Sequence, residues 1–360
     1  MPLSKINSKN YPIPIAERII PSTYSILQSL KKMDLINKKL LLVFDKERFI
    51  GVLSIGDIQK AIIANLSLET SILKIMRTDF VYAKAKDDKK DILNLMQKHR
   101  IECMPILDDN RQLVTAYMWA DLFASKDRNG SIKLNLPVVI MAGGKGSRLK
   151  PLTNILPKPL IPIGEKTIIE QIMDNFCDAG CKRFYISINY KAEMIRYYFS
   201  ELKQKRYHIS YIQENKPLGT AGSIHLLKGK IKTTFFVSNC DIVIDQDVVE
   251  IEKYHRMNKN EITIVAALKH HSVPYGILET GRNGLCKKLT EKPEYTYKIN
   301  TGLYVLEPHL IAEIPKDEYF HITALINKLI SERRKVGVFP ISEKSWLDIG
   351  EANEYYKFVK

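Results

Sequence analysis

The 360-residue sequence has no long hydrophobic run, no secretory N-terminus and only five cysteines. No apolar stretch approaches the ~20 residues that a membrane-spanning helix needs. Residues 1–14, MPLSKINSKNYPIP, contain no apolar core that could act as a signal peptide. An odd number of cysteines in a long chain does not indicate a disulfide framework, and we expect Cys177 and Cys181 to be reduced residues of one helix. We therefore expect a cytoplasmic protein with no membrane partner.

The sequence also lacks a dense basic block. Lys and Arg number 55 against 40 Asp and Glu, which gives a formal net charge of +15. The excess is spread along the chain, is mostly lysine and is not interleaved with aromatic residues, so we expect no nucleic-acid partner. We interpret it as a solvated lysine-rich surface, which is also compatible with a small phosphate-bearing substrate.

The first third of the chain contains an internal repeat. Its first copy is LLLVFDKERFIGVLSIGDIQKAI (40–62) and its second is MPILDDNRQLVTAYMWADLFA (104–124). Each copy predicts a strand, an Asp-containing turn, a second strand, and an Asp that opens a helix. These aspartates are Asp57 and Asp121. A helix-like segment precedes each copy, YSILQSLKKM (24–33) and DILNLMQKHRI (91–101).

This repeat resembles a tandem pair of cystathionine-β-synthase-type (CBS) domains, which we expect within residues 1–125, followed by a polar linker at 126–135. The resemblance implies an adenine nucleotide between the two copies, with Asp57 and Asp121 on ribose hydroxyls. An Asp at a helix start also caps the first turn without any ligand, and this alternative stays open. The second copy departs from the pattern, because Thr115 stands where the first has Gly51.

From Leu136 onward the sequence alternates between strand and helix patterns. The apolar run LPVVIMA (136–142) predicts a buried strand, and KTIIEQIMDNFCDAG (166–180) predicts a helix. In that helix Thr167 and Glu170 form a capping box, and Gly180 ends it. Further strands are expected at RFYISIN (183–189), ISYI (209–212), TFFVSN (234–239) and EITIVAAL (261–268). The alternation predicts an α/β domain with a largely parallel sheet, whose ligands bind at the carboxyl ends of the strands.

A glycine-rich loop follows the first of these strands, in AGGKGSRLKPLTNILPKPL (142–160). It is not a P-loop, because Gly146 follows Lys145, and it is not a dinucleotide fingerprint, because Leu149 replaces the last glycine. Its bare backbone can offer N–H groups to an anion. Arg148 and Lys158 add charge-assisted contacts. The loop by itself predicts a phosphate site.

The motifs that follow identify a resemblance to the sugar-1-phosphate nucleotidyltransferases. They are GGKGSRLKPLTNILPKPLIPIG (143–164), ENKPLGTAGS (214–223), SNCDI (238–242), YGILE (275–279), EKP (291–293), NTGLYV (300–305) and WLDIG (346–350). The resemblance covers about residues 136–360 and implies a Rossmann-like domain with a mostly parallel mixed sheet. It also implies the transfer of a nucleoside monophosphate from a nucleoside triphosphate to a sugar 1-phosphate, with release of pyrophosphate.

The resemblance assigns roles residue by residue. The residues implied for the nucleotide are Ala142, Gly143, Gly144, Gly146, Arg148, Glu214, Gly219 and Thr220. Lys158 would reach the α-phosphate or the leaving group, and Lys292 would hold the sugar phosphate. Gly276, Glu291 and Asn300 are implied as sugar contacts, whereas Thr301 either contacts the sugar or only packs its strand. Asp241 and Asp348 would bind Mg²⁺, the implied cofactor. Cys240 replaces the glycine that commonly precedes Asp241, from which we expect altered packing and no loss of catalysis.

The combination of a CBS pair with this catalytic domain is similar to the glucosamine-1-phosphate guanylyltransferases of bacterial legionaminic acid synthesis. Guanine is favoured because a carboxylate such as Glu214 only accepts hydrogen bonds, and guanine offers adjacent N1–H and N2–H₂ donors. A uridylyl- or cytidylyltransferase of the same fold stays open, since backbone groups can read the base instead. A non-catalytic nucleotide-sensing regulatory protein is the other alternative. We expect a homo-oligomer.

Overall fold

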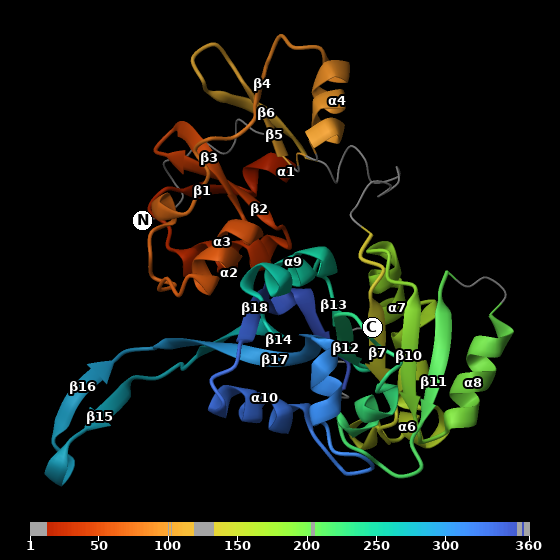
Figure 1. Cartoon of the computed structure of the whole chain (residues 1–360). Helices are drawn as coiled ribbons and strands as arrows, with labels where there is room; N and C mark the ends of the chain where they lie inside the picture. Colours follow the sequence, from red (N-terminus) through yellow and green to blue (C-terminus); the bar gives the residue numbers. More distant parts are fainter. Residues whose placement is uncertain are drawn as a thin grey trace. The chain divides into compact units, whose positions relative to one another are not determined.

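The computed structural model describes residues 13–99, 101, 103–118, 133–202, 206–350 and 355. The chain divides into two compact units, Met1–Asn129 and Gly130–Lys360, both drawn in Figure 1. Asp121 and most of the expected linker lie outside the described residues. The domain limits 1–125, 126–135 and 136–360 therefore stay predictions.

The N-terminal unit repeats one strand arrangement. Its first copy contains β1 (Ile19–Pro21), α2 (Ile26–Ile36), β2 (Leu40–Asp45), β3 (Arg48–Ser54) and α3 (Ile55–Ile63). The second contains β4 (Ala83–Lys84), α4 (Lys89–His99), β5 (Cys103–Leu107) and β6 (Leu113–Met118). In each copy the first strand is parallel to the second, which is antiparallel to the third. Two short helices lie in the described part of this unit, α1 (Ile13–Ala16) and η2 (Ile72–Lys74).

The two copies share one hydrophobic core. Leu42 and Phe44 of the first copy lie in the same buried cluster as Leu107 and Met118 of the second. A single copy exposes one apolar face, and packing the two together removes both faces from water. The repeat is therefore one folding unit made of two similar halves.

The C-terminal unit is built on a seven-stranded sheet. The order is β11 (His208–Gln213), β10 (Arg183–Ile188), β7 (Pro137–Met141), β12 (Phe235–Asn239), β17 (Glu294–Leu306), β14 (Ile262–Ser272) and β18 (Val336–Ser342). Only β17 is antiparallel to its neighbours, and the other pairs are parallel. The prediction of a Rossmann-like α/β domain with a mostly parallel mixed sheet is confirmed.

Helices cover both faces of this sheet, because buried strands alternate their side chains between two cores. On β7, Val138 and Ile140 join the core with α7 (Ile168–Asp178), α8 (Ala192–Glu201) and α9 (Val248–Asn258). Val139 and Met141 join the opposite core with η5 (Gly222–Leu227), η7 (Pro308–Glu313) and α10 (Ile322–Ser331). No helix in the described parts of the chain is long and apolar enough to cross a membrane.

The predicted limits of α7 are confirmed. Thr167 accepts a hydrogen bond from the Glu170 amide, and the Glu170 carboxylate accepts one from the Thr167 amide at 2.9 Å. Gly180 follows the helix with a φ of +91°, a conformation that glycine adopts without steric cost. These local signals were sufficient to place the helix.

Two small sheets extend the main one. β13 (Ile242–Ile244) pairs with β19 (Trp346–Asp348), which follows η8 (Glu343–Ser345). β15 (Ile277–Thr280), η6 (Arg282–Gly284) and β16 (Cys286–Thr290) form a hairpin beyond the ends of β14 and β17. Figure 1 shows this hairpin at the tip of an arm that projects away from the sheet. We call residues 269–298 the arm.

Candidate active site

The glycine-rich loop leaves the carboxyl end of β7, as predicted. It continues through η3 (Ser147–Leu149), α6 (Leu152–Ile155), η4 (Lys158–Leu160), β8 (Pro162–Ile163) and β9 (Lys166–Thr167). The Ala142 amide donates to the Ser187 carbonyl oxygen at 2.9 Å. Gly144 is exposed, with no heavy atom within 4 Å of where a Cβ would lie. Gly144 therefore leaves open space beside the loop, whereas Ala142 is committed to the sheet.

Gly146 allows the loop to fold back toward Lys158. Its φ is +62°, and a Cβ there would lie 2.8 Å from Thr153 Cγ2 and 3.1 Å from Lys158 Cβ. The Gly146 carbonyl oxygen accepts a hydrogen bond from Thr153 Oγ1 at 2.9 Å. A larger residue would clash and would also strain the left-handed backbone. The glycine is thus required by the turn itself.

Three charged side chains that are far apart in the sequence meet beside this loop. Lys158 Nζ donates a hydrogen bond to the Asp241 carboxylate in a largely buried pair, with side chains 9% and 16% exposed. The β13–β19 pairing places Asp348 opposite Ile242, next to Asp241. The Ile349 amide donates to the Asp241 carbonyl oxygen at 2.8 Å. We call Lys158, Asp241 and Asp348 the charged cluster.

The space around Gly350 shows how tightly this cluster is packed. A Cβ on Gly350 would lie 2.7 Å from Asp348 Oδ1, 2.9 Å from Asp241 Oδ2 and 3.0 Å from Lys158 Nζ. The three polar atoms therefore surround one point. The Gly350 amide also donates to Asp348 Oδ1 at 2.8 Å, which orients that carboxylate.

The surroundings of the cluster affect two titratable groups. Burial raises the pKa of Asp348, and the neighbouring Asp241 carboxylate adds to the rise, while the Gly350 amide, Lys158 and Arg148 oppose it. Burial raises the pKa of the Cys240 thiol to about 12. Cys240 therefore stays a neutral thiol in the core, which agrees with a packing role.

The donor set of the cluster fits Mg²⁺. Two carboxylates converge on one point, and Mg²⁺ in phosphate-binding sites is usually held by one or two carboxylates together with substrate phosphates and water. Within the described residues no group of three or more His, Cys, Asp or Glu side chains forms a complete metal site. The remaining ligands would then have to come from the substrate or the solvent.

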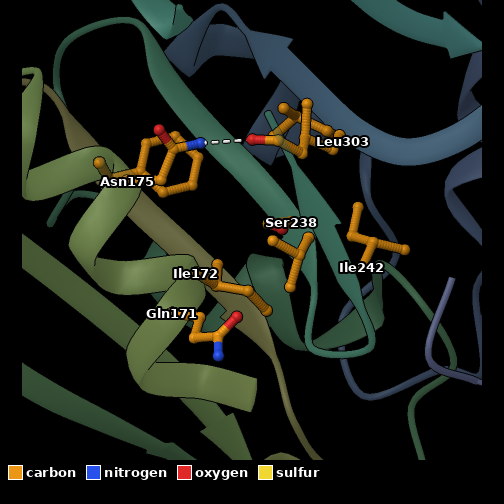
Figure 2. A pocket seen from close by; sticks show the side chains of 9 residues that line it. Gln171, Ile172, Asn175, Ser238, Ile242 and Leu303 are labelled. Atoms are coloured by element: carbon orange, nitrogen blue, oxygen red, sulfur yellow. Dashed lines mark hydrogen bonds between the residues drawn. The ribbon is translucent and has the colours of Figure 1, made fainter. Parts of the chain in front are cut away.

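The pocket in Figure 2 is lined by residues of α7, β12, β13 and β17. Its volume of about 10 Å³ is at the lower limit for one water molecule. Asn175 Nδ2 donates to the Ile244 carbonyl oxygen at 2.7 Å, drawn as a dashed line in Figure 2. This contact anchors β13, and hence the strand pairing beside Asp241, to α7. The pocket is structural and is too small for a nucleotide.

Glu214 lies against the glycine-rich loop and is 5% exposed. A Cβ on Gly143 would lie 2.9 Å from Glu214 Oε1. One carboxylate oxygen accepts from Ser187 Oγ, and the other accepts from the Leu218 amide at 3.2 Å. Each oxygen keeps one lone pair. Glu214 therefore joins β10 to the loop at 217–223 and can still accept further hydrogen bonds.

The loop at 217–223 is fixed by a segment that the sequence analysis did not single out. A Cβ on Gly219 would lie 2.7 Å from the Phe320 carbonyl oxygen. The Phe320 amide donates to the Leu218 carbonyl oxygen at 3.0 Å. Thr220 Oγ1 accepts from the Ile322 amide at 3.1 Å and lies 3.2 Å from His321 Nδ1. In this structure Gly219 is needed for packing, and the Thr220 hydroxyl caps α10.

The structure divides the predicted sugar residues between two places. Asn300 Oδ1 accepts from the Gly302 amide at 3.0 Å, and Gly302 packs on Asn239 at the end of β12. Gly276, Glu291 and Lys292 are exposed on the arm. The β14–β17 pairing is unbroken from Asn300 to Glu294, about 20 Å of extended strand. The structure therefore brings Asn300 toward the cluster but does not place the other three there.

Two residues missed by the sequence analysis hold the segment that follows the glycine-rich loop. Lys191 Nζ donates to the carbonyl oxygens of Asn154 and Ile155, at 2.6 and 2.7 Å. Tyr190 Oη donates to the Thr153 carbonyl oxygen at 3.2 Å. These contacts tie the segment between Arg148 and Lys158 to the start of α8. Their sequence, a Tyr and a Lys after a strand, carried no signal for this role.

In the N-terminal unit, the contacts of Asp57 among the described residues are with Ser54 and Arg77. It forms a capping box with Ser54, whose amide donates to Asp57 Oδ2 at 3.0 Å. Arg77 Nε donates to Asp57 Oδ1 at 2.8 Å. The capping alternative accounts for the contacts with Ser54, and the ion pair with Arg77 is an additional contact outside the helix. The expected adenine nucleotide stays a prediction, and Asp121 lies outside the described residues.

Comparison with known proteins identifies the class of the C-terminal unit. The nucleotidyl transferase family model matches residues 137–360, which is more than half of the chain. This chain therefore belongs to the nucleotidyl transferase family. A CBS domain model matches residues 72–114, the region of the second repeat.

Several named relatives are similar over the same region. A mannose-1-phosphate guanyltransferase of Pichia angusta is 33% identical over 230 residues, covering 60% of this chain and 61% of that protein. Its counterpart in Yarrowia lipolytica is 31% identical over 232 residues, with the same coverage. The chain thus spans about three fifths of the length of these relatives.

Two solved structures share the fold of this region. HddC from Yersinia pseudotuberculosis is 28% identical, with a TM-score of 0.50, and the match covers 62% of this chain and 98% of that one. A second structure of HddC, complexed with GMP-PN, matches with the same values.

Proposed function

We propose that this protein transfers GMP from GTP to a sugar 1-phosphate, giving a GDP-sugar and pyrophosphate. The observation that carries the proposal is the meeting of Lys158, Asp241 and Asp348 beside a glycine-rich loop at the carboxyl edge of the sheet. Cations and carboxylates in this arrangement suit a reaction between two phosphate esters, which would otherwise repel each other.

The reaction is an in-line displacement. A phosphate oxygen of the sugar 1-phosphate attacks the α-phosphorus of GTP, and the new P–O bond forms as the bond to the bridging oxygen breaks. Pyrophosphate leaves with that electron pair. The loop glycines and Arg148 hold the triphosphate, and Lys158 neutralises charge at the α-phosphate. Asp241 and Asp348 would hold Mg²⁺, which when bound neutralises further charge on the transferred group.

Guanine is proposed as the base for two reasons. The named relatives are guanylyltransferases, and a carboxylate at the base edge matches the adjacent N1–H and N2–H₂ donors of guanine. Glu214 lies against Gly143 and keeps lone pairs for such contacts. We expect Glu214→Gln to lower the preference for GTP over UTP by about tenfold or more, since one acceptor becomes a donor. An unchanged ratio of kcat/KM values would contradict this role.

The sugar is proposed only as a hexose 1-phosphate. Glu291 could accept from a hydroxyl or from the ammonium group of an amino sugar, so mannose 1-phosphate and glucosamine 1-phosphate are the first substrates to compare. Glucosamine 1-phosphate would fit the expected place in legionaminic acid synthesis. A homo-oligomer and an adenine nucleotide at the CBS pair belong to the same proposal.

A matrix of substrates tests the proposal. Four nucleoside triphosphates are combined with each sugar 1-phosphate, and pyrophosphate release is measured. We expect the highest kcat/KM with GTP, and release that depends on the sugar 1-phosphate. Higher efficiency with UTP or CTP would favour the related transferases, and no release with any pair would favour a regulatory protein.

A further inference from the structure

We propose that Lys158 is an exchangeable partner of Asp241: it neutralises this carboxylate in the substrate-free site and releases it when metal and triphosphate arrive together. The inference rests on the proposed function, because the triphosphate is what attracts Lys158 away. It goes further by predicting that the protein binds a divalent cation poorly without a nucleotide.

The first observation is that Lys158 already occupies the carboxylate that a metal would need. Its Nζ donates to Asp241 Oδ2, and the pair is largely buried, so little solvent screening weakens it. Asp241 Oδ2, Asp348 Oδ1 and Lys158 Nζ all lie within 3.0 Å of the Cβ position of Gly350. A cation between the two carboxylates would therefore lie very close to the lysine ammonium group.

The second observation is the charge of the cluster. Two carboxylates face Lys158, and Arg148 is near enough to affect Asp348. A divalent cation added to this set creates an excess of positive charge in a partly buried site. If Lys158 left Asp241 with no new partner, its ammonium group would be buried and uncompensated, which is strongly unfavourable. A triphosphate removes both problems, because it supplies negative charge and accepts hydrogen bonds from Lys158.

The third observation is that the described residues supply the cluster with only two acidic ligands for a metal. No third His, Cys, Asp or Glu completes the pair of carboxylates among the described residues. Oxygen atoms of the triphosphate would supply the missing ligands. Metal and nucleotide should therefore increase each other's affinity by the same factor.

Titration with Mn²⁺, a spectroscopic substitute for Mg²⁺, tests this inference without measuring turnover. Free Mn²⁺ is followed by electron paramagnetic resonance, with and without a non-hydrolysable GTP analogue. We expect Mn²⁺ to bind the wild type at least about tenfold more tightly when the analogue is present. This gain is counted after subtracting the Mn²⁺ that binds the analogue in the absence of protein. We expect Lys158→Met to bind Mn²⁺ about tenfold more tightly than the wild type when no nucleotide is present, because Asp241 is then free.

Lys166→Met is the matched control, because it removes a similar ion pair, Lys166–Asp174, which is more exposed. Its Mn²⁺ affinity should equal that of the wild type. Lys158→Gln tests the same point if the Met variant does not fold, since Gln keeps a hydrogen-bond donor without the charge. Circular dichroism reports folding. Equal or weaker Mn²⁺ binding by folded Lys158 variants would overturn the inference. Tight Mn²⁺ binding by the wild type without a nucleotide would overturn it too. Failure of the proposed function would appear separately, as an absence of pyrophosphate release by the wild type.

Discussion

Asp57 and Asp241 are both buried or half-buried carboxylates with a cationic partner, yet their surroundings differ. Asp57 contacts Ser54, three residues away, and the half-exposed Arg77. Asp241 contacts Lys158, 83 residues away, and shares one small space with Asp348. The contact of Asp57 with Ser54 caps its own helix, and the ion pair with Arg77 adds a bond within the same unit. The contacts of Asp241 bring a cation and a second carboxylate together at the edge where ligands of α/β sheets bind. These contacts cap no helix and pair no strand.

Under the proposed function, the comparison separates a carboxylate with structural contacts from one that we expect in a reaction site. A helix cap stabilises the fold by itself. A cluster of three charges is costly to bury and is explained by a ligand that takes part in its charge balance. Substitutions at the two aspartates should therefore affect different properties of the protein.

The largest effect is expected at the carboxylates of the cluster. We predict that Asp241→Asn and Asp348→Asn each lower kcat by at least about 100-fold, because the charge that would hold Mg²⁺ at the transferred phosphoryl group is lost. Pyrophosphate release at saturating Mg²⁺ measures this, and Asp109→Asn, on an exposed turn of the N-terminal unit, is the control. Near-normal turnover in either variant would show that these carboxylates, like Asp57, are not needed for turnover.

A smaller but specific effect is expected at Gly350. We predict that Gly350→Ala lowers kcat by about tenfold or more with little change in stability, because the three atoms nearest to the new Cβ are all side-chain ends of the cluster. Gly56→Ala is the control, since a Cβ there meets nothing closer than 3.6 Å. A variant as active as the wild type would show that the spacing of the cluster is not critical.

The next effect concerns the arm. The family resemblance implies a sugar-phosphate contact for Lys292, although the structure places this residue on the arm and not at the cluster. We predict that the arm approaches the cluster when the sugar 1-phosphate binds, so that Lys292→Ala removes a charge-assisted phosphate contact and raises the KM for the sugar 1-phosphate by about tenfold while the KM for GTP stays the same. Lys288→Ala, on β16 of the same arm and 3.7 Å from Glu279, should leave both constants unchanged. Equal kinetics of the two variants would remove Lys292 from the sugar site.

The smallest effect is expected at Asp57, on stability alone. We predict that Asp57→Ala lowers the unfolding free energy of the N-terminal unit by about 1–2 kcal/mol, from the lost capping box and the ion pair with Arg77. Hydrogen exchange of the α3 amides measures this. Turnover at saturating substrates should not change, and a large fall in turnover would show that Asp57 does more than cap its helix.

Local patterns were enough to predict strands β7, β10, β11, β12 and β14 of the sheet and the limits of α7, because capping and strand burial depend on neighbouring residues. Strands β17 and β18 were not predicted from such patterns. The motif order was enough to predict Lys158, Asp241 and Asp348. The ion pair between Lys158 and Asp241 was not predictable, since its two residues are 83 positions apart in the chain. The approach of Asp348 was not predictable either, since it depends on β13 pairing with a strand about a hundred residues later. The same holds for the contact of Ser187 with Glu214 and for the anchoring by Lys191, which contacts only carbonyl oxygens. The arm shows the opposite case. Its motifs were predicted to form one sugar site, but the structure spreads them along the extended pairing of β14 and β17.

The most direct test of the account is a single-turnover transfer of labelled GMP from GTP to a sugar 1-phosphate, with enzyme in excess. The account predicts a labelled GDP-sugar and an equal amount of pyrophosphate with the wild type, and at least about 100-fold slower formation with Asp348→Asn. Equal rates for the two proteins, or pyrophosphate release without a labelled sugar product, would contradict it.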